Sequence, residues 1–245
     1  MSKNLANLTN GDDSKNEKMR EVTEVFDSVA HRYDLMNDLM SLGTHRILKR
    51  IFCDSIGLRP GYSVLDIAGG TGDISRLISR IVEPTGSVMM LDVNETMLRI
   101  GRDRLIDKGR AEVQCVLGDA EAVPISDKSF DAVTVAFGIR NIAQKESALR
   151  ECYRVLKPGG RLAILEFSKP KSRRLDALYR IYRRAWPLAG LFVVGNAQPY
   201  QYLVESIDEH PAQEAMLLLL EVAGFKNLKF ENLLGGIVAI HQGTR

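Results

Sequence analysis

The sequence predicts an α/β fold built on a Rossmann-like, doubly wound sheet of seven strands, and three observations lead to this prediction. Short apolar runs alternate with segments of helical periodicity through the middle of the chain. One apolar run stops at Asp66 and is followed by Gly69, Gly70 and Gly72, as a buried strand is when it enters a tight turn before a helix. Gly235 and Gly236 separate the last two runs and indicate a closing hairpin.

The expected elements follow in order. Helices are expected over residues 21–38 and 44–56, ahead of the first strand, and over 212–223, where Pro211 stands at the helix start. The expected strands, most of them separated by helices, are 63–67, 87–92, 112–117, 130–137, 161–167, 225–233 and 237–241. Residues 168–210 form a helical insert after the fifth strand.

Composition narrows the function classes. The 245 residues are 45% hydrophobic and carry a net charge of +2, which is typical of an ordinary soluble protein and weak for a nucleic-acid partner. The polar segment 1–16 reads as a disordered tail ahead of a single domain over 17–245. No apolar run reaches the roughly 20 residues of a membrane span. Three scattered cysteines show neither a disulfide framework nor metal-ligand spacing, so no metal and a cytoplasmic location are expected.

Acidic residues close three successive predicted strands. Asp66 ends the first and Asp92 the second, about 20 residues beyond the glycine loop, where a ribose-binding acid is expected. Asp119 follows the third strand and is itself followed by Ala120. A single acid at such a place is more often a solvated strand end. Three of them at the ligand-binding edge of an open sheet indicate a site.

The loop chemistry separates the candidate cofactors. A dinucleotide site has the pattern G-x-G-x-x-G, whereas Gly70 and Gly72 are followed by Ser75 in place of the third glycine. A carboxylate at Asp66 can face the cationic end of S-adenosylmethionine, and turn amides can face its carboxylate. Asp92 suits the ribose hydroxyls. Asp119 and the Ala120 amide suit the adenine ring, although a plain strand-to-helix turn would explain the glycine loop alone.

Longer segments carry a resemblance. The glycine loop, the three acids and Leu156-Lys157-Pro158-Gly159-Gly160 resemble a class I S-adenosylmethionine-dependent methyltransferase. From about Met19 to the C-terminus the chain resembles the ubiquinone/menaquinone biosynthesis C-methyltransferase family. The segments that carry this closer resemblance are Val25–Asp34, Met36–Asp38, Phe137–Asn141, Leu165–Pro170 and Tyr202–Ile207.

The resemblance implies a cofactor, an acceptor and a site. The cofactor is S-adenosylmethionine, and the acceptor is a polyprenylated benzoquinol or demethylmenaquinol, methylated at a ring carbon; the choice between the two rings stays open. Another lipid or small-molecule acceptor is the alternative. The segment after the fourth strand lacks the Asn/Asp-Pro-Pro-Tyr/Phe motif of amine-directed DNA enzymes, and no Pro-Cys occurs, so nucleic acid is not expected. The implied cofactor residues are Asp66, Gly69, Gly70, Thr71, Gly72, Asp92, Asp119 and Ala120.

In the resembled family an Arg-Asn pair after the fourth strand has the catalytic role, here Arg140 and Asn141. Because arginine stays protonated, we expect Arg140 to stabilise a phenolate while a water takes the proton, and Asn141 to orient that water or the ring hydroxyl. A structural loop arginine is the alternative. Tyr33 is expected as a wall or donor of the acceptor site. Ala136 departs from the family, which often has a small hydroxyl residue there.

The insert is basic at its start. Residues 169–184 contain seven lysines and arginines and a single acidic residue, Asp176. Apolar residues recur in this segment at helical spacing ahead of Trp186. A solvated helix packed on the sheet would explain this pattern. Since the family's acceptors carry prenyl tails, the resemblance favours a lid that contacts the inner membrane face through residues 169–192. A homo-oligomer or an assembly with other quinone-biosynthesis enzymes stays open.

Overall fold

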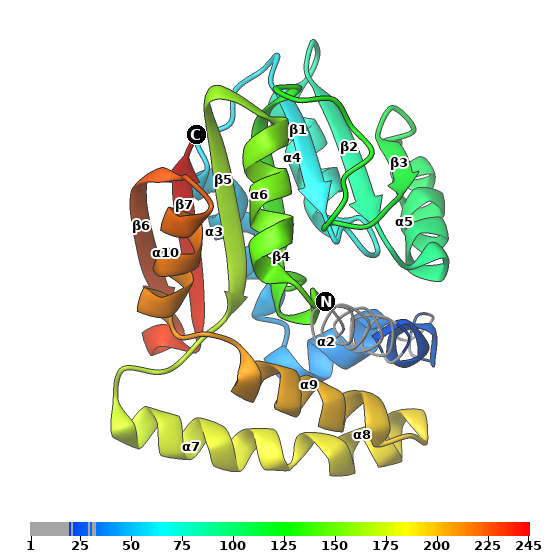
Figure 1. Cartoon of the computed structure of the whole chain (residues 1–245). Helices are drawn as coiled ribbons and strands as arrows, with labels where there is room; N and C mark the ends of the chain where they lie inside the picture. Colours follow the sequence, from blue (N-terminus) through cyan, green and yellow to red (C-terminus); the bar gives the residue numbers. More distant parts are fainter. Residues whose placement is uncertain (1–19, 21, 29, 31–32) are drawn as a thin grey trace, which may run out of the picture.

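The computed structural model describes residues 20, 22–28, 30 and 33–245, and its centre is one seven-stranded sheet of order β3-β2-β1-β4-β5-β7-β6 (Figure 1). The strand bounds are β1 Ser63–Ile67, β2 Ser87–Asp92, β3 Gln114–Leu117, β4 Phe130–Ala136, β5 Leu156–Phe167, β6 Lys226–Leu233 and β7 Val238–Thr244.

The sheet is doubly wound. β1 pairs in parallel with both β2 and β4. β2 and β3 extend the sheet to one side of β1, and β4 and β5 extend it to the other, so the strand order reverses between β1 and β4. β7 is antiparallel to β5 and to β6, and the 3₁₀ turn η3, Leu234–Gly236, joins β6 to β7. The predicted fold class and the closing hairpin are therefore confirmed. A reversal of this kind opens a crevice at the carboxyl ends of the strands.

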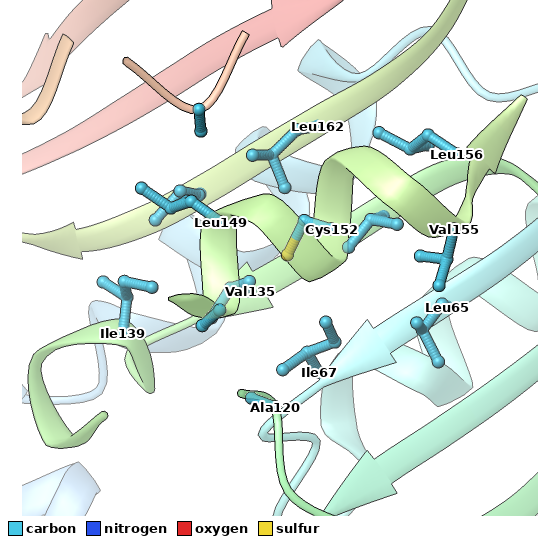
Figure 2. Packing of buried hydrophobic residues seen from close by; sticks show 14 of the residues in the cluster. Leu65, Ile67, Ala120, Val135, Ile139, Leu149, Cys152, Val155, Leu156 and Leu162 are labelled. Carbon is cyan, nitrogen blue, oxygen red and sulfur yellow. The ribbon is translucent and has the colours of Figure 1, made fainter. Parts of the chain in front are cut away.

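Helices cover both faces of the sheet. One face carries α3 (His45–Ser55), α4 (Asp73–Val82) and α5 (Glu95–Asp107), which pack through Phe52, Ile78 and Leu105. The other carries α6 (Lys145–Val155) and α10 (Gln213–Val222). Figure 2 shows α6 lying on the sheet through Leu149 and Cys152. The central parallel strands β1 and β4 are buried on both sides, which is why they are nearly continuous apolar runs in the sequence.

Several expected bounds differ from the structure. The helix expected over 21–38 is found in two pieces, a helical stretch over 22–28 and α2 (Tyr33–Ser41), with a 3₁₀ residue at Ala30 between them. β3 begins at Gln114 rather than residue 112, and β7 continues to Thr244 rather than ending at residue 241. β5 begins at Leu156 rather than Arg161, because Leu156 pairs with Phe130 across a register shift. The tail expected over 1–16 lies outside the described residues.

The insert consists of α7 (Arg173–Arg184), α8 (Trp186–Val194) and α9 (Gln198–Glu209). Figure 1 shows these helices at the end of the molecule toward which the parallel strands point, together with α2. Their shared core contains Met36 and Met40 of α2, Tyr179 of α7 and Trp186 of α8. The insert and α2 therefore form one apolar layer over the crevice. None of the described helices is both long and apolar enough to cross a bilayer.

Candidate active site

A cavity of about 320 Å³ lies between the carboxyl edge of the sheet and the layer formed by α2 and the insert. Its wall on the sheet side comes from the ends of β1, β2 and β4 and from the loops that follow them. Its outer wall comes from α2, α7 and α9, through apolar side chains such as Met40, Tyr179 and Leu203. One half of the cavity is therefore polar and rich in glycine, and the other half is apolar.

The glycine loop is held in one shape. Gly72 adopts φ +80° at the N-cap of α4, and Gly70 adopts φ +54°, both in the left-handed region that glycine tolerates. A β-carbon on Gly101 would lie 2.5 Å from the Gly70 carbonyl oxygen, so α5 packs directly on the loop backbone. Gly69, Gly70 and Thr71 line the cavity. Gly72 shapes the turn behind it.

Asp92 connects the loop to the second strand. Its Oδ2 accepts a hydrogen bond from the Gly70 amide at 2.8 Å, and its Oδ1 accepts one from the Asn94 amide at 2.9 Å. Burial raises the pKa of this carboxyl group above its ordinary value. Asp92 lines the cavity. A carboxylate oxygen can accept two hydrogen bonds, so each oxygen of Asp92 can still accept one from a ligand hydroxyl.

Asp66 is fixed by two hydroxyl groups. Its Oδ2 accepts from Ser75 Oγ at 2.6 Å and its Oδ1 accepts from Thr134 Oγ1 at 2.8 Å. Burial raises the pKa of this carboxyl group to about 6 even though both hydroxyls favour the charged form. Ser75, the residue that broke the dinucleotide pattern, is thus a fully buried donor to Asp66. The glycine loop packs around the Asp66 carboxylate, whose negative charge would repel the pyrophosphate of a dinucleotide.

The third acid lies on the same cavity. Asp119 Oδ1 accepts from the Glu121 amide at 2.9 Å, which holds the turn after β3. The Gly118 amide donates to the Asp92 carbonyl oxygen at 3.0 Å and ties this turn to the end of β2. Asp119 and Ala120 both line the cavity. The structure therefore brings seven of the eight predicted cofactor residues to one cavity, Gly72 being the exception.

Arg140 lies in the 3₁₀ turn η2 (Ile139–Asn141) after β4 and lines the same cavity. Its Nη1 donates to Glu166 Oε1 at 2.9 Å and to the Phe137 carbonyl oxygen at 2.5 Å. Its guanidinium carbon lies 5.5 Å from the centroid of the Phe167 ring. Within the described part of the chain its buried Nε has no hydrogen-bond partner. The guanidinium is therefore held in one position at the edge of the cavity.

Asn141 is oriented from the insert. Tyr202 of α9 donates its hydroxyl to Asn141 Oδ1 at 3.1 Å. Since the amide oxygen takes this hydrogen bond, the amide nitrogen is the group that Asn141 can offer to the cavity that it lines. Arg140 and Asn141 together therefore present donors, which is the arrangement that stabilises a developing oxyanion.

Two remaining expectations concern Tyr33 and Ala136. Tyr33 begins α2, and its side chain lies outside the described residues. Ala136 ends β4 and lines the cavity without a hydroxyl group. The expected position of Tyr33 on the acceptor side stays a prediction.

Sequence reasoning missed the residues that hold the site together, namely Glu166, Tyr202, Ser75 and Thr134. Glu166 carried a signal, because a carboxylate inside an otherwise apolar strand run needs a buried cation. The local pattern marks Ser75 only as the position where a dinucleotide motif has its third glycine. Nothing in the local pattern pairs Tyr202 with Asn141, which lies 61 positions earlier.

The polar half of the cavity fits S-adenosylmethionine. A carboxylate at the end of β2 suits vicinal ribose hydroxyls, and the turn after β3 offers an acid and an amide of the kind that read an adenine edge. Asp66 places negative charge behind the glycine loop, where a cationic ligand end is favoured. Sheet order and acid placement are those of the class I S-adenosylmethionine-dependent methyltransferases. S-adenosylmethionine is therefore the cofactor of this enzyme.

Comparison with known proteins narrows the class to a family. The model of the ubiE/COQ5 methyltransferase family matches residues 12–245, and the chain belongs to that family. The ubiquinone/menaquinone biosynthesis C-methyltransferase UbiE of Ectopseudomonas mendocina is 52% identical over 233 residues, which are 94% of this chain and 91% of that protein. The protein of the same name from Azotobacter vinelandii is 50% identical over 94% of this chain and 92% of its own length.

Solved structures agree on the fold. A SAM-dependent methyltransferase from Aquifex aeolicus superposes with a TM-score of 0.64 at 19% identity, covering 86% of this chain and 97% of that one. A SAM-dependent methyltransferase from Thermotoga maritima gives a TM-score of 0.64 at 20% identity, covering 90% and 98%. At these identities the likeness concerns the fold alone.

Proposed function

We propose that this enzyme methylates a ring carbon of a polyprenylated quinol in the biosynthesis of ubiquinone, menaquinone or both. The observation that carries the proposal is the joint placement of Arg140 and Asn141. They present donors at the boundary between the cofactor half and the apolar half of one cavity. Membership of the ubiE/COQ5 family and the names of the relatives support the same acceptor class.

The chemistry requires an activated ring carbon. S-adenosylmethionine supplies an electrophilic methyl group when it is bound. The ring carbon of a quinol becomes nucleophilic when a hydroxyl group loses its proton and pushes charge onto the ring. Arg140 and Asn141 stabilise that oxyanion with N–H donors, and a water takes the proton because arginine stays protonated. After transfer, the methylated carbon loses its own proton to water, and the ring becomes aromatic again as a phenolate. The phenolate oxygen then takes a proton back from water, so one proton is released for each methyl group transferred.

The apolar half receives the ring. Its walls include Phe137 and Phe167, whose ring centroids lie 5.2 Å apart, together with Met36, Met40 and Leu203. Such a wall excludes water and strengthens each hydrogen bond to the oxyanion. Tyr33, at the start of α2, is assigned to this wall or to a hydrogen bond with the acceptor.

The polar half positions the methyl donor. Asp92 is assigned to the ribose hydroxyls, and Asp119 with the Ala120 amide to the adenine ring. Asp66 faces the cationic end of the cofactor, where a buried carboxylate favours positive charge. Positioning is the main requirement here, because the sulfide that leaves is neutral.

The test is a methyl-transfer assay with labelled S-adenosylmethionine. The acceptors are demethylmenaquinol and 2-methoxy-6-polyprenyl-1,4-benzoquinol, and Arg140→Ala is assayed beside the wild type. We expect transfer to ring carbon by the wild type and a loss of about a hundredfold or more in the variant, with cofactor affinity retained. Cofactor binding without transfer to either quinol would overturn the assignment of the acceptor.

The enzyme also contacts an anionic membrane surface through residues 169–192, where its substrate resides. Exposed apolar residues, Leu178 and Ile181 on α7 and Leu188 and Leu191 on α8, accompany exposed basic residues. These basic residues are Lys171, Arg173, Arg174, Arg180 and Arg184. Arg183 turns inward to Asp208 at 2.8 Å and does not belong to this surface.

Sedimentation with anionic liposomes at low salt measures this contact. Arg174→Glu/Arg184→Glu is expected to reduce binding at least tenfold, because each basic residue near an anionic surface contributes about 1 kcal/mol. Lys226→Glu/Lys229→Glu on β6 changes charge equally on another face and serves as the control. Equal losses in both variants, or no binding by the wild type, would contradict the assignment.

A further inference from the structure

Unfavourable backbone conformations gather around the cavity. Among the described residues, six that are not glycine have positive φ angles, where a β-carbon meets the backbone. Four of these six line the cavity, although cavity residues are a minority of the chain: Leu42 (φ 49°), Ala68 (φ 53°), Phe137 (φ 56°) and Leu234 (φ 49°). Backbone strain of this kind concentrates at ligand sites.

The two leucines need a separate explanation. Ala68 and Phe137 follow β1 and β4 directly and belong to the cofactor and acceptor loops. Leu42 and Leu234 are 78% and 50% exposed, so burial of their side chains does not offset the strain. Glycine or asparagine would adopt the same backbone at lower cost. Folding of the chain alone therefore gives no reason for a leucine at either position.

Both leucines line the cavity and are also exposed, so each lies where the cavity meets solvent. Leu42 follows α2, and Leu234 lies in the β6–β7 turn. The segment 171–182 reaches a neighbour of each leucine. The Tyr182 hydroxyl of α7 donates to the Met40 carbonyl oxygen at 3.1 Å, and the Lys171 amide, just ahead of α7, donates to the Gly235 carbonyl oxygen at 3.3 Å. Tyr182 also lines the cavity and is 38% exposed. Three exposed apolar side chains from three parts of the chain thus line the same cavity.

We propose that Leu42, Tyr182 and Leu234 form the portal through which the prenyl tail of the acceptor leaves the cavity. The inference rests on the proposed function, since it assigns the second half of the same substrate. A cavity of about 320 Å³ is at the small end for a single ligand and must already hold the cofactor and a ring. A chain of several isoprene units therefore has to pass through an opening with an apolar rim.

The portal leads toward the surface assigned to the membrane. Leu178 lies one helical turn before Tyr182, so the two project from the same side of α7, and Leu178 is 63% exposed. A tail that leaves beside Tyr182 meets apolar side chains along α7 before it reaches lipid. Leu42 and Leu234 present apolar surface at positions where glycine or asparagine would reduce the backbone strain.

The decisive experiment compares acceptors of two tail lengths. Leu42→Asn and Leu234→Asn remove the apolar rim but retain a residue that tolerates a left-handed backbone, so both variants are expected to fold. Lys128→Asn is the matched control, because Lys128 has φ 55°, is exposed and does not line the cavity. Each variant is assayed for methyl transfer to quinols with one and with four isoprene units.

We expect kcat/KM for the long-tailed quinol to fall roughly tenfold in each leucine variant, since burial of one leucine contributes about that factor. For the short-tailed quinol, kcat/KM should stay within about twofold of wild type. Lys128→Asn should leave both values unchanged. Equal losses for both acceptors would place the leucines in the ring site or the fold, and no loss for either would remove the portal; each result overturns the proposal.

Binding supplies a readout that does not need turnover. Trp186 is the single tryptophan of the chain, lines the cavity and lies 5.7 Å from Tyr182 between ring centroids. Quenching of its fluorescence by short- and long-tailed quinones gives two dissociation constants for each variant. If the wild type transfers methyl to neither quinol, the proposed reaction fails, and these constants still test the portal. Leucine variants that retain the wild-type preference for the long tail overturn it.

Discussion

The guanidinium of Arg140 rests on the carboxylate of Glu166, with Nη1 2.9 Å from Oε1 and side-chain exposures of 5% and 0%. The same carboxylate also accepts from the backbone amides of Arg140 at 3.3 Å and Phe167 at 2.9 Å. Glu166 therefore fixes both the side chain and the backbone turn of Arg140. It also balances the charge of Arg140 in a place without solvent.

Replacing Glu166 by glutamine should destabilise the enzyme by about 3 kcal/mol and reduce kcat at least tenfold, because a buried guanidinium loses its counter-charge. Urea unfolding measures the first effect and steady-state kinetics the second. The double variant Glu166→Gln/Arg140→Met leaves no unpaired charge and should be more stable than Glu166→Gln alone. If its losses are instead additive, the two side chains are not coupled.

Tyr202→Phe should lower kcat roughly tenfold without changing cofactor affinity. The substitution removes the donor that orients the Asn141 amide and costs about 1 kcal/mol of stability. Tyr179→Phe provides the control, since Tyr179 also lines the cavity but its buried hydroxyl has no hydrogen-bond partner among the described residues. Matched losses of kcat in both variants would argue against a specific role for Tyr202.

Cofactor affinity should depend on pH through Asp66. Burial raises the pKa of this carboxyl group to about 6, so its negative charge, and with it affinity for the cationic end of S-adenosylmethionine, should increase as pH rises through 6. Ser75→Ala removes a donor that favours the charged form and should move this midpoint to higher pH. Calorimetric titration between pH 5 and 8 measures the midpoint. Asp66→Asn should abolish the dependence, and a dependence that persists would assign it to another group.

The sequence predicts the central sheet of this enzyme well, because buried strands and the turns after them follow from local patterns. β1 and β2 begin and end where expected, since buried parallel strands are apolar runs with polar ends. The acids Asp66, Asp92 and Asp119 reach one cavity because the carboxyl ends of parallel strands meet at one edge.

Long-range partners escape such reasoning. In the sequence, Ser75 is only a departure from the dinucleotide motif. In the structure it donates to Asp66, which lies nine positions earlier and on the other side of the turn. Glu166 and Arg140 lie on neighbouring elements 26 positions apart, and Tyr202 reaches Asn141 from the insert. These contacts depend on how helices settle on the sheet edge, which no periodicity in a single sequence encodes.

Buried histidines should make the fold sensitive to acid. Burial lowers the pKa of His210 to about 3, with Lys145 and Arg140 contributing, and burial lowers the pKa of His241 to about 4. Because the unfolded chain binds protons near pH 6.5 and the folded chain does not, unfolding is favoured progressively as pH falls below 6.5. At pH 5 each histidine should cost up to about 2 kcal/mol of stability.

His210→Gln removes one of these titrating groups with little change in volume. Both nitrogens of His210 lack a hydrogen-bond partner among the described residues, so the substitution breaks no bond that the structure contains. We expect the loss of unfolding free energy between pH 7 and pH 5 to be smaller in the variant by about 2 kcal/mol. Asp66 has a raised pKa and gains stability as pH falls through 6, but it contributes equally to both proteins and cancels in the comparison. Urea unfolding at the two pH values measures the difference, and parallel losses in wild type and variant would show that His210 binds a proton in the folded state.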